Sequence, residues 1–245
     1  MGEYCKNNVT TLEHACYLIE YFSEIMWHWK KWDRKMTTFL IKFINRLRKR
    51  QILLTIYLSY YFTYLKLYDL KNNTNFCNSQ VPDEFGAEYR EGSTGNFPVH
   101  PKTIRNLVLH ANLPYSAKII DVGHGSGLPL LTLYKMGFRN LSGVEHGLVP
   151  FELSERNLKE IANIYYGDAF EIDYSAYDTI LFSSPFRGKL AERFINSLPT
   201  NIHTLITIAH NQELELVLIK KGYEELYSVK HPFYNTFNGK VWRLL

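Results

Sequence analysis

From residue 102 onward, short apolar runs alternate with segments of helical periodicity, and the connections between them are short. Strands alternating with helices in this way are typical of a parallel, doubly wound sheet. The pattern predicts an α/β fold in which the last two strands, Val229–His231 and Lys240–Leu244, close the sheet as an antiparallel pair. The earlier strands are expected at Ala117–Val122, Leu141–Glu145, Ile164–Tyr166, Tyr177–Phe182 and His203–Ala209, and the helices at Thr103–Asn112, Leu128–Met136, Pro150–Lys159, Arg187–Ser197 and Gln212–Lys221.

The front of the chain has a different pattern. Residues 10–70 contain neither Pro nor Gly, and their apolar residues recur at helical spacing, which predicts two or three helices. The uncharged stretch Gln51–Leu65 has 15 residues, fewer than the roughly 18–20 that cross a bilayer, so we expect a buried or interfacial helix and no transmembrane span. The polar segment Lys71–Gln80 has the composition of a linker. We therefore expect a helical segment at 1–80 and an α/β domain at 81–245.

The net charge of +4 is unevenly distributed. Residues 1–80 hold 12 Lys/Arg and 6 Asp/Glu, a net of +6, and residues 81–245 hold 16 and 18, a net of −2. Within the basic front, Trp27–Lys35 interleaves rings with cations, and further cations follow at Arg46–Arg50. This segment is either a helical cap with solvated cations or a contact surface for nucleic acid, an acidic protein or a peripheral membrane site.

The three cysteines Cys5, Cys16 and Cys77 are widely spaced, with no Cys-x-x-Cys pair and no His at zinc-ligand spacing. We therefore expect no metal site. Cysteines used in this way favour a reduced, intracellular compartment, with the cytoplasm as the expected location.

The strongest chemical signal is Asp121-Val122-Gly123-His124-Gly125-Ser126-Gly127, which follows an expected strand and precedes an expected helix. Glycines let a ligand approach the backbone closely, and a helix N-terminus offers unpaired N–H groups. A dinucleotide fingerprint needs a third glycine where this chain has Leu128. The alternatives are the first motif of class I methyltransferases and a turn that binds nothing. We expect His124 to face solvent, with a role as a base as the alternative.

Three more signals lie at strand ends. Glu145 comes 24 residues after Asp121, one strand–helix–strand unit later, so the two strand ends should be neighbours. A carboxylate there can accept both hydroxyls of a ribose, at roughly 1.5–3 kcal/mol for each hydrogen bond. Asp168 and Ala169 follow the next strand and could bind an adenine, with Phe170 beside the base, and Leu181–Gly188 ends the fourth strand.

These segments, in this order, resemble the class I S-adenosylmethionine-dependent methyltransferases over about residues 83–245. They are most similar to a subgroup with an Asn-Pro-Phe-like motif after strand four and an upstream segment like Phe85–Gly95, and more distantly to protein-lysine methyltransferases. The resemblance implies a Rossmann-like sheet and S-adenosylmethionine as cofactor. It implies that the methionine moiety contacts Asp121, Gly123, Gly125 and Gly127, the ribose Glu145, and the adenine Asp168 and Ala169, that Thr94 and Gly95 cover the cofactor, and that Ser184, Pro185 and Phe186 face the acceptor.

The expected activity is methyl transfer to a macromolecular acceptor, with a protein side chain favoured over nucleic acid. Displacement at a sulfonium depends on alignment of the reacting groups, so the absence of an obvious acid–base pair does not count against it. One alternative is an RNA or DNA methyltransferase, since Ser-Ser-Pro-Phe is loosely similar to the motif of enzymes that methylate flipped bases. The other is a non-catalytic binding scaffold, because Ser184 stands where the family usually has Asn or Asp.

Overall fold

The computed structural model describes residues 41, 44, 52–77, 98–209, 212–230 and 238–245. The chain divides into two compact units, Met1–Thr55 and Ile56–Leu245. Little of the first unit is described, so the account below concerns the second.

Several expectations fall outside the described residues. They include Thr94 and Gly95 of the upstream loop, the cationic segments Trp27–Lys35 and Arg46–Arg50, and the expected domain boundary at residues 80 and 81.

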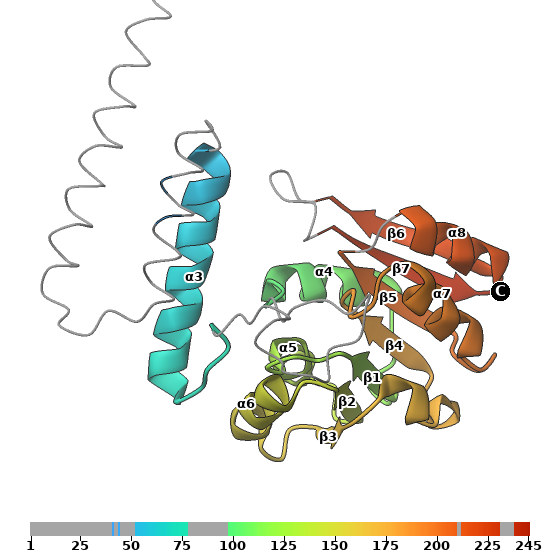
Figure 1. The fold of residues 1–245 in the computed structure, drawn as a ribbon, viewed down its shortest axis with the longest axis horizontal. Coiled ribbons are helices and arrows are strands. Elements are labelled where there is room, and N and C mark those ends of the chain that lie inside the picture. Colours follow the sequence, from blue (N-terminus) through green and yellow to red (C-terminus); the bar gives the residue numbers. More distant parts are fainter. Residues whose placement is uncertain (1–40, 42–43, 45–51, 78–97, 210–211, 231–237) are drawn as a thin grey trace, which may run out of the picture. The chain divides into compact units, whose positions relative to one another are not determined.

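A seven-stranded sheet with the strand order β3-β2-β1-β4-β5-β7-β6 forms the centre of the second unit (Figure 1). The first five strands are parallel, and β7 is antiparallel to both of its neighbours. The fold is therefore the Rossmann-like doubly wound sheet with an antiparallel strand pair that the sequence predicts. The strands are β1 (Ile119–Val122), β2 (Leu141–Glu145), β3 (Asn163–Tyr166), β4 (Thr179–Phe182), β5 (Thr204–Ile208), β6 (Tyr223–Val229) and β7 (Gly239–Leu244).

Helices cover both faces of this sheet, with α4, α5 and α6 on one side and α7 and α8 on the other (Figure 1). The central strands β1, β4 and β5 are buried along their whole length, as expected for parallel strands covered on both faces. The helices are α3 (Ile52–Asn72), α4 (Pro101–Ala111), α5 (Leu128–Lys135), α6 (Leu148–Leu158), α7 (Gly188–Ser197) and α8 (Gln212–Lys220), with 3-10 turns η2 (Ala169–Glu171) and η3 (Tyr174–Ala176).

One strand lies elsewhere than expected. The strand that pairs with β7 is Tyr223–Val229, whereas the sequence predicted Val229–His231. Glu224 and Glu225 are exposed because β6 is the edge of the sheet, and charged residues are a common way to protect an edge strand. Those charges interrupt the apolar run that otherwise indicates a strand.

The described part of the segment expected as a linker, residues 71–77, is held by hydrogen bonds to Asp69. Asp69 is buried, and its carboxylate accepts hydrogen bonds from Phe76 N at 2.9 Å, Cys77 N at 2.8 Å and the Thr74 hydroxyl at 2.8 Å. A buried carboxylate with three donors is well compensated, so residues 71–77 have a fixed path. None of the helices in the described part of the chain is long and apolar enough to span a bilayer.

Candidate cofactor site

The parallel strands bring the expected site residues to one edge of the sheet. Asp121 at the end of β1 lies in register with Gly143 of β2 and with Leu181 of β4. The carboxyl ends of these strands therefore meet where the chain turns into α5, which is the position at which open α/β sheets bind ligands. We call this region the binding edge.

Residues Gly123–Gly127, the glycine loop, connect β1 to α5. Gly123, Gly125 and Gly127 have φ angles of 69°, 57° and 89°, in the left-handed region that residues with a side chain rarely adopt. A Cβ added at Gly123 would lie 2.5 Å from Cβ of Pro185, and one added at Gly127 would lie 2.6 Å from Cδ1 of Leu158. Both the backbone angles and the space therefore require glycine.

The carboxylate of Glu145 contacts the glycine loop directly. Its Oε2 accepts a hydrogen bond from Gly125 N at 2.8 Å, and its Oε1 accepts one from Gly147 N at 2.8 Å. The sequence-based expectation that β1 and β2 place the loop beside this acid is confirmed. Each carboxylate oxygen can accept a second hydrogen bond, so the side chain retains capacity for a diol. Burial raises the pKa of Glu145, although the N–H groups of Gly147 and Gly125 oppose that shift.

Asp121 is fully buried, and within the described part of the chain neither of its carboxylate oxygens has a hydrogen-bond partner. Burial raises the pKa of Asp121 well above its usual range, and the nearby charge of Glu145 raises it further. Buried polar groups are rarely left without a partner in folded proteins, and exceptions tend to lie in functional sites. A cationic ligand group would satisfy this carboxylate.

His124 does not face solvent, contrary to the sequence-based expectation. Its side chain is buried, its Nδ1 lies 2.9 Å from the carbonyl oxygen of Gly125, and its ring occupies the space above Gly143 of β2. Burial lowers the pKa of His124 to about 4, so the ring is neutral near pH 7. The missing Cβ at Gly143 creates the room for the ring, and this pairing of a small residue with a large one cannot be read from the loop alone.

Asp168 and Ala169 follow β3 at the same edge. Gly167 N donates to the carbonyl oxygen of Glu145 at 3.0 Å, which holds the end of β3 against β2. Asp168 caps the turn η2 by accepting from Phe170 N at 3.0 Å, and Ala169 is buried. The structure thus places both residues near Glu145, and their binding of an adenine remains a prediction.

Ser184, Pro185 and Phe186 follow β4 and lie beside the glycine loop through the contact of Pro185 with Gly123. Ser184 is buried and has a φ of 52°, which is uncommon for a residue with a side chain and often marks a functional site. The ring of Phe186 packs in an aromatic cluster, with centroid distances of 5.4 Å to Phe194, 5.8 Å to Phe170 and 5.9 Å to Phe182. Their role toward an acceptor remains a prediction.

Sequence reasoning missed Asn157 of α6. This buried side chain donates from Nδ2 to the carbonyl oxygen of Ser126 at 2.9 Å, and its Oδ1 accepts from Asn75 N at 2.8 Å. A single Asn on an expected helix carries no signal, because its two partners lie 31 and 82 residues away in sequence.

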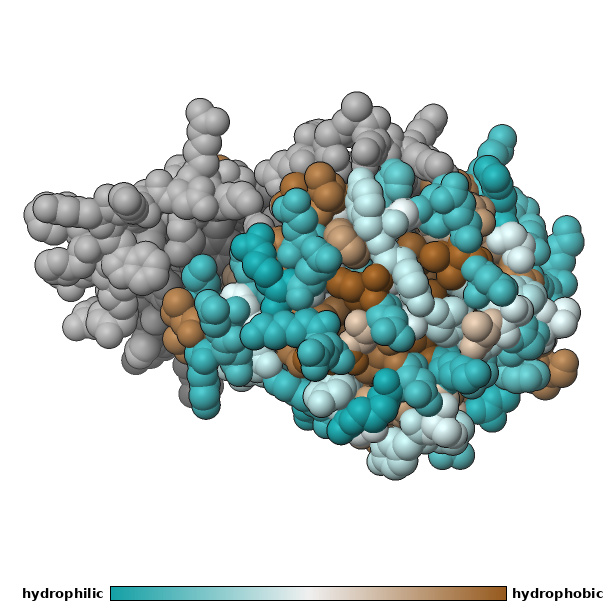
Figure 2. Space-filling model, turned by 90° about the horizontal axis from the view of Figure 1, so that it is seen from below, coloured by the Kyte–Doolittle hydropathy of each residue, from teal (hydrophilic) through white to brown (hydrophobic). Residues whose placement is uncertain are grey.

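On the face of the molecule that Figure 2 shows, hydrophobic residues lie in patches among hydrophilic ones. Among the described residues, no three His, Cys, Asp or Glu side chains are grouped closely enough to hold a metal ion.

No model of a protein family matches the chain. The chain is similar to EEF1A lysine methyltransferase 2 of Danio rerio, with 26% identity over 142 residues, covering 49% of this chain and 60% of that protein. The match therefore spans less than two thirds of that relative.

Among solved structures, the chain is similar to the glycopeptide N-methyltransferase MtfA complexed with S-adenosylhomocysteine, with a TM-score of 0.51 and 8% identity over 61% of this chain and 91% of that chain. The ribosomal protein L11 methylase of Lactobacillus delbrueckii subsp. bulgaricus gives a TM-score of 0.47 and 13% identity over 59% and 80%. The first of these similarities confirms the methyltransferase-like fold that the sequence resemblance implies.

Proposed function

We propose that this chain is an S-adenosylmethionine-dependent methyltransferase of class I. The observation that carries the proposal is the pair of acids at the binding edge. Glu145 is hydrogen-bonded to the glycine loop, and Asp121 beside it is buried with no partner among the described residues. The glycine loop between them has no side chain at three positions. This set of groups fits a ligand that combines a diol, an ammonium group and a second positive charge.

The residues of the chain bind and orient the cofactor, which supplies an electrophilic methyl group on a positively charged sulfur. Glu145 accepts the ribose hydroxyls, and Asp121 compensates the positive charge of the methionine moiety. Asp168 and Ala169 contact the adenine. A cationic group beside Asp121 opposes the effect of burial and lowers the pKa of this carboxyl toward its ordinary range. The carboxylate is therefore charged when the cofactor is bound.

Catalysis then depends on alignment of the acceptor with the methyl group rather than on a strong acid or base. Ser184 lies at the expected acceptor side, after β4, and its backbone has a left-handed conformation with a φ of 52°. A strained, buried residue of this kind is consistent with a preorganised acceptor position. Ser has one polar atom on a shorter side chain where an amide has two, so it reaches the acceptor group through its hydroxyl oxygen alone.

We favour a protein side chain as the acceptor. The support is the relative named as a lysine methyltransferase, together with the distant resemblance to protein-lysine methyltransferases. Contact of the basic front of the chain with a membrane surface or with nucleic acid is a separate proposal, and it rests on the net charge of that segment alone.

The proposal is tested in two steps. Calorimetry with S-adenosylmethionine and S-adenosylhomocysteine should show one site for each ligand. Purified chain and radiolabelled S-adenosylmethionine are then added to a cell extract, and the labelled product is treated with protease or nuclease. Label sensitive to protease supports a protein acceptor, and label sensitive to nuclease overturns that preference. Cofactor binding without any labelled product favours the scaffold, and the absence of cofactor binding overturns the proposal as a whole.

A further inference from the structure

One amide side chain joins the turn after α3 to the glycine loop. Asn75 N donates to Oδ1 of Asn157, and Nδ2 of Asn157 donates to the carbonyl oxygen of Ser126. The two partners need opposite ends of the amide, so the orientation of the side chain is fixed by its neighbours. Asn157 and Ser126 are both buried, so the bond between them is shielded from bulk water, whereas the bond from Asn75 is partly buried.

The α3 side of this connection is rigid. Beyond the bonds to Asp69, Phe76 is fully buried, and its ring lies 6.1 Å from the ring of Tyr68. Lys135 of α5 contacts the Tyr68 hydroxyl and places its Nζ 4.2 Å from the centre of that ring. The turn after α3 is therefore held by its own helix and by α5.

On the loop side, the bond from Asn157 fixes a whole peptide unit. The carbonyl of Ser126 points to Asn157, and the N–H of Gly127 in the same peptide donates to the carbonyl oxygen of His124 at 2.9 Å. Because a peptide unit is planar, holding both of its polar ends fixes its orientation. Leu158, the neighbour of Asn157, lies against Gly127, so α6 also sets the position of the loop by direct packing.

We propose that Asn157 is a positioning residue that couples the turn at residues 74–77 to the cofactor loop. This inference rests on the proposed function and extends it. Part of the helical front, outside residues 83–245, then helps to form the cofactor site. Coupling between two sites is reciprocal, so cofactor binding also stabilises the turn after α3.

The test variant is Asn157→Asp, which is isosteric. It keeps an oxygen for Asn75 N, but it has no donor for Ser126 and places a negative charge near that carbonyl. S-adenosylhomocysteine should bind about tenfold more weakly by calorimetry, since roughly one buried hydrogen bond to the loop is lost. The matched control is Asn201→Asp. Asn201 donates to the carbonyl oxygens of Ser175 at 2.9 Å and Tyr177 at 2.8 Å, which both lie outside the glycine loop, and its variant should bind the ligand as the wild type does.

Hydrogen exchange of the wild-type chain provides a second measurement that needs no variant. Saturating S-adenosylhomocysteine should slow exchange of the amides at residues 75–77 as well as those at residues 123–127. In Asn157→Asp at saturation, only the second group should stay protected. Unchanged exchange at residues 75–77 in the wild type overturns the coupling, as does an affinity of Asn157→Asp within about twofold of the wild type. If the wild type does not bind the ligand at all, the proposed function fails, and the coupling fails with it.

Discussion

Two regions of the sheet differ in how their buried polar groups are satisfied. At the binding edge, both oxygens of Asp121, Nε2 of His124 and Oγ of Ser183 are buried and have no hydrogen-bond partner within the described chain. At the other end, which we call the paired end and which comprises β5, β6, β7 and α8, polar groups find partners within the protein.

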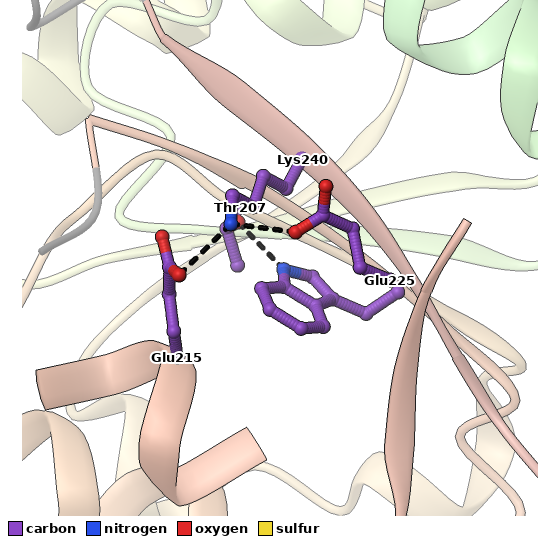
Figure 3. Close-up of polar contacts among 5 residues, drawn as sticks. Thr207, Glu215, Glu225 and Lys240 are labelled. Atoms are coloured by element: carbon purple, nitrogen blue, oxygen red, sulfur yellow. Dashed lines mark hydrogen bonds and ion pairs between the residues drawn. The ribbon is translucent and has the colours of Figure 1, made fainter. Parts of the chain in front are cut away.

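Figure 3 shows the paired end. Lys240 of β7 forms ion pairs with Glu215 at 2.8 Å and Glu225 at 2.6 Å, and Nε1 of Trp242 donates to the hydroxyl of Thr207 at 3.0 Å. The Tyr223 hydroxyl, also buried, donates to the carbonyl oxygen of Ile202 at 2.8 Å.

The binding edge and the paired end therefore have different roles. A polar group buried without a partner costs roughly 1–3 kcal/mol, so several of them gathered at one place indicate a site that a bound ligand would complete. The paired end needs no ligand and serves the stability of the sheet. Substitutions at the binding edge should therefore change ligand affinity, and matched substitutions at the paired end should change stability alone.

The largest effect is expected for Gly125→Val. A branched side chain at a φ of 57° strains the loop and occupies the methionine position, so affinity for S-adenosylhomocysteine should fall roughly a thousandfold or more in calorimetry. The control is Gly222→Val at the paired end, where φ is 94° and an added Cβ meets only ordinary contact. That variant should be less stable but should bind the ligand normally. Equal affinity of Gly125→Val and the wild type would show that the cofactor lies elsewhere.

The second effect concerns pH and His124. Its pKa in the folded protein, about 4, is below the ordinary value of 6.5. Below pH 6.5, His124 therefore takes up a proton in the unfolded chain but not in the folded chain. The free energy of unfolding decreases as the pH falls from 6.5 toward 4. The full loss is about 3 kcal/mol, from roughly 1.4 kcal/mol per pKa unit.

Denaturant unfolding of the wild type and of His124→Gln, at pH 7.5 and pH 4.5, checks this expectation. The variant removes this contribution, whereas the titration of Asp121 and Glu145 stays common to both proteins. A difference in unfolding free energy between the two proteins that does not change with pH would contradict a buried, neutral ring.

The smallest effect is expected for removal of one acid at each end. Glu145→Ala should weaken cofactor binding at least about tenfold with the fold intact, since two hydrogen bonds to the ribose are lost. Glu225→Ala should leave binding unchanged and cost about 0.5 kcal/mol of stability, as expected for a half-exposed ion pair. If both variants bind the ligand equally well, the assignment of Glu145 to the ribose is wrong.

Much of this architecture could be predicted because it is local in sequence. The β1 strand is a short run rich in β-branched residues, and the glycine loop follows it directly, so the sequence alone predicts the order of the elements and the approach of Glu145 to the loop. The sequence predicts β6 at the wrong residues because Glu224 and Glu225, which are exposed at the sheet edge, interrupt the apolar run of this strand.

What the sequence did not reveal depends on contacts between distant segments. His124 is buried only because Gly143, on another strand, leaves space for its ring. Asn157 is an ordinary polar residue by sequence, and its partners become visible only when the turn after α3 and the glycine loop meet α6. Polar residues that bridge elements carry no periodicity, so no reading of a single segment would find them.

The contact of Gly123 with Pro185 has a consequence for how this molecule can change. A methyl group at position 123 would lie 2.5 Å from Cβ of Pro185, so the glycine loop and the residues after β4 are in direct contact. Under the proposed function, substitutions at residues 184–186 that alter the choice of acceptor would also shift the loop that contacts the cofactor. In a library of variants at residues 184–186, selectivity for the acceptor and affinity for the cofactor should therefore change together.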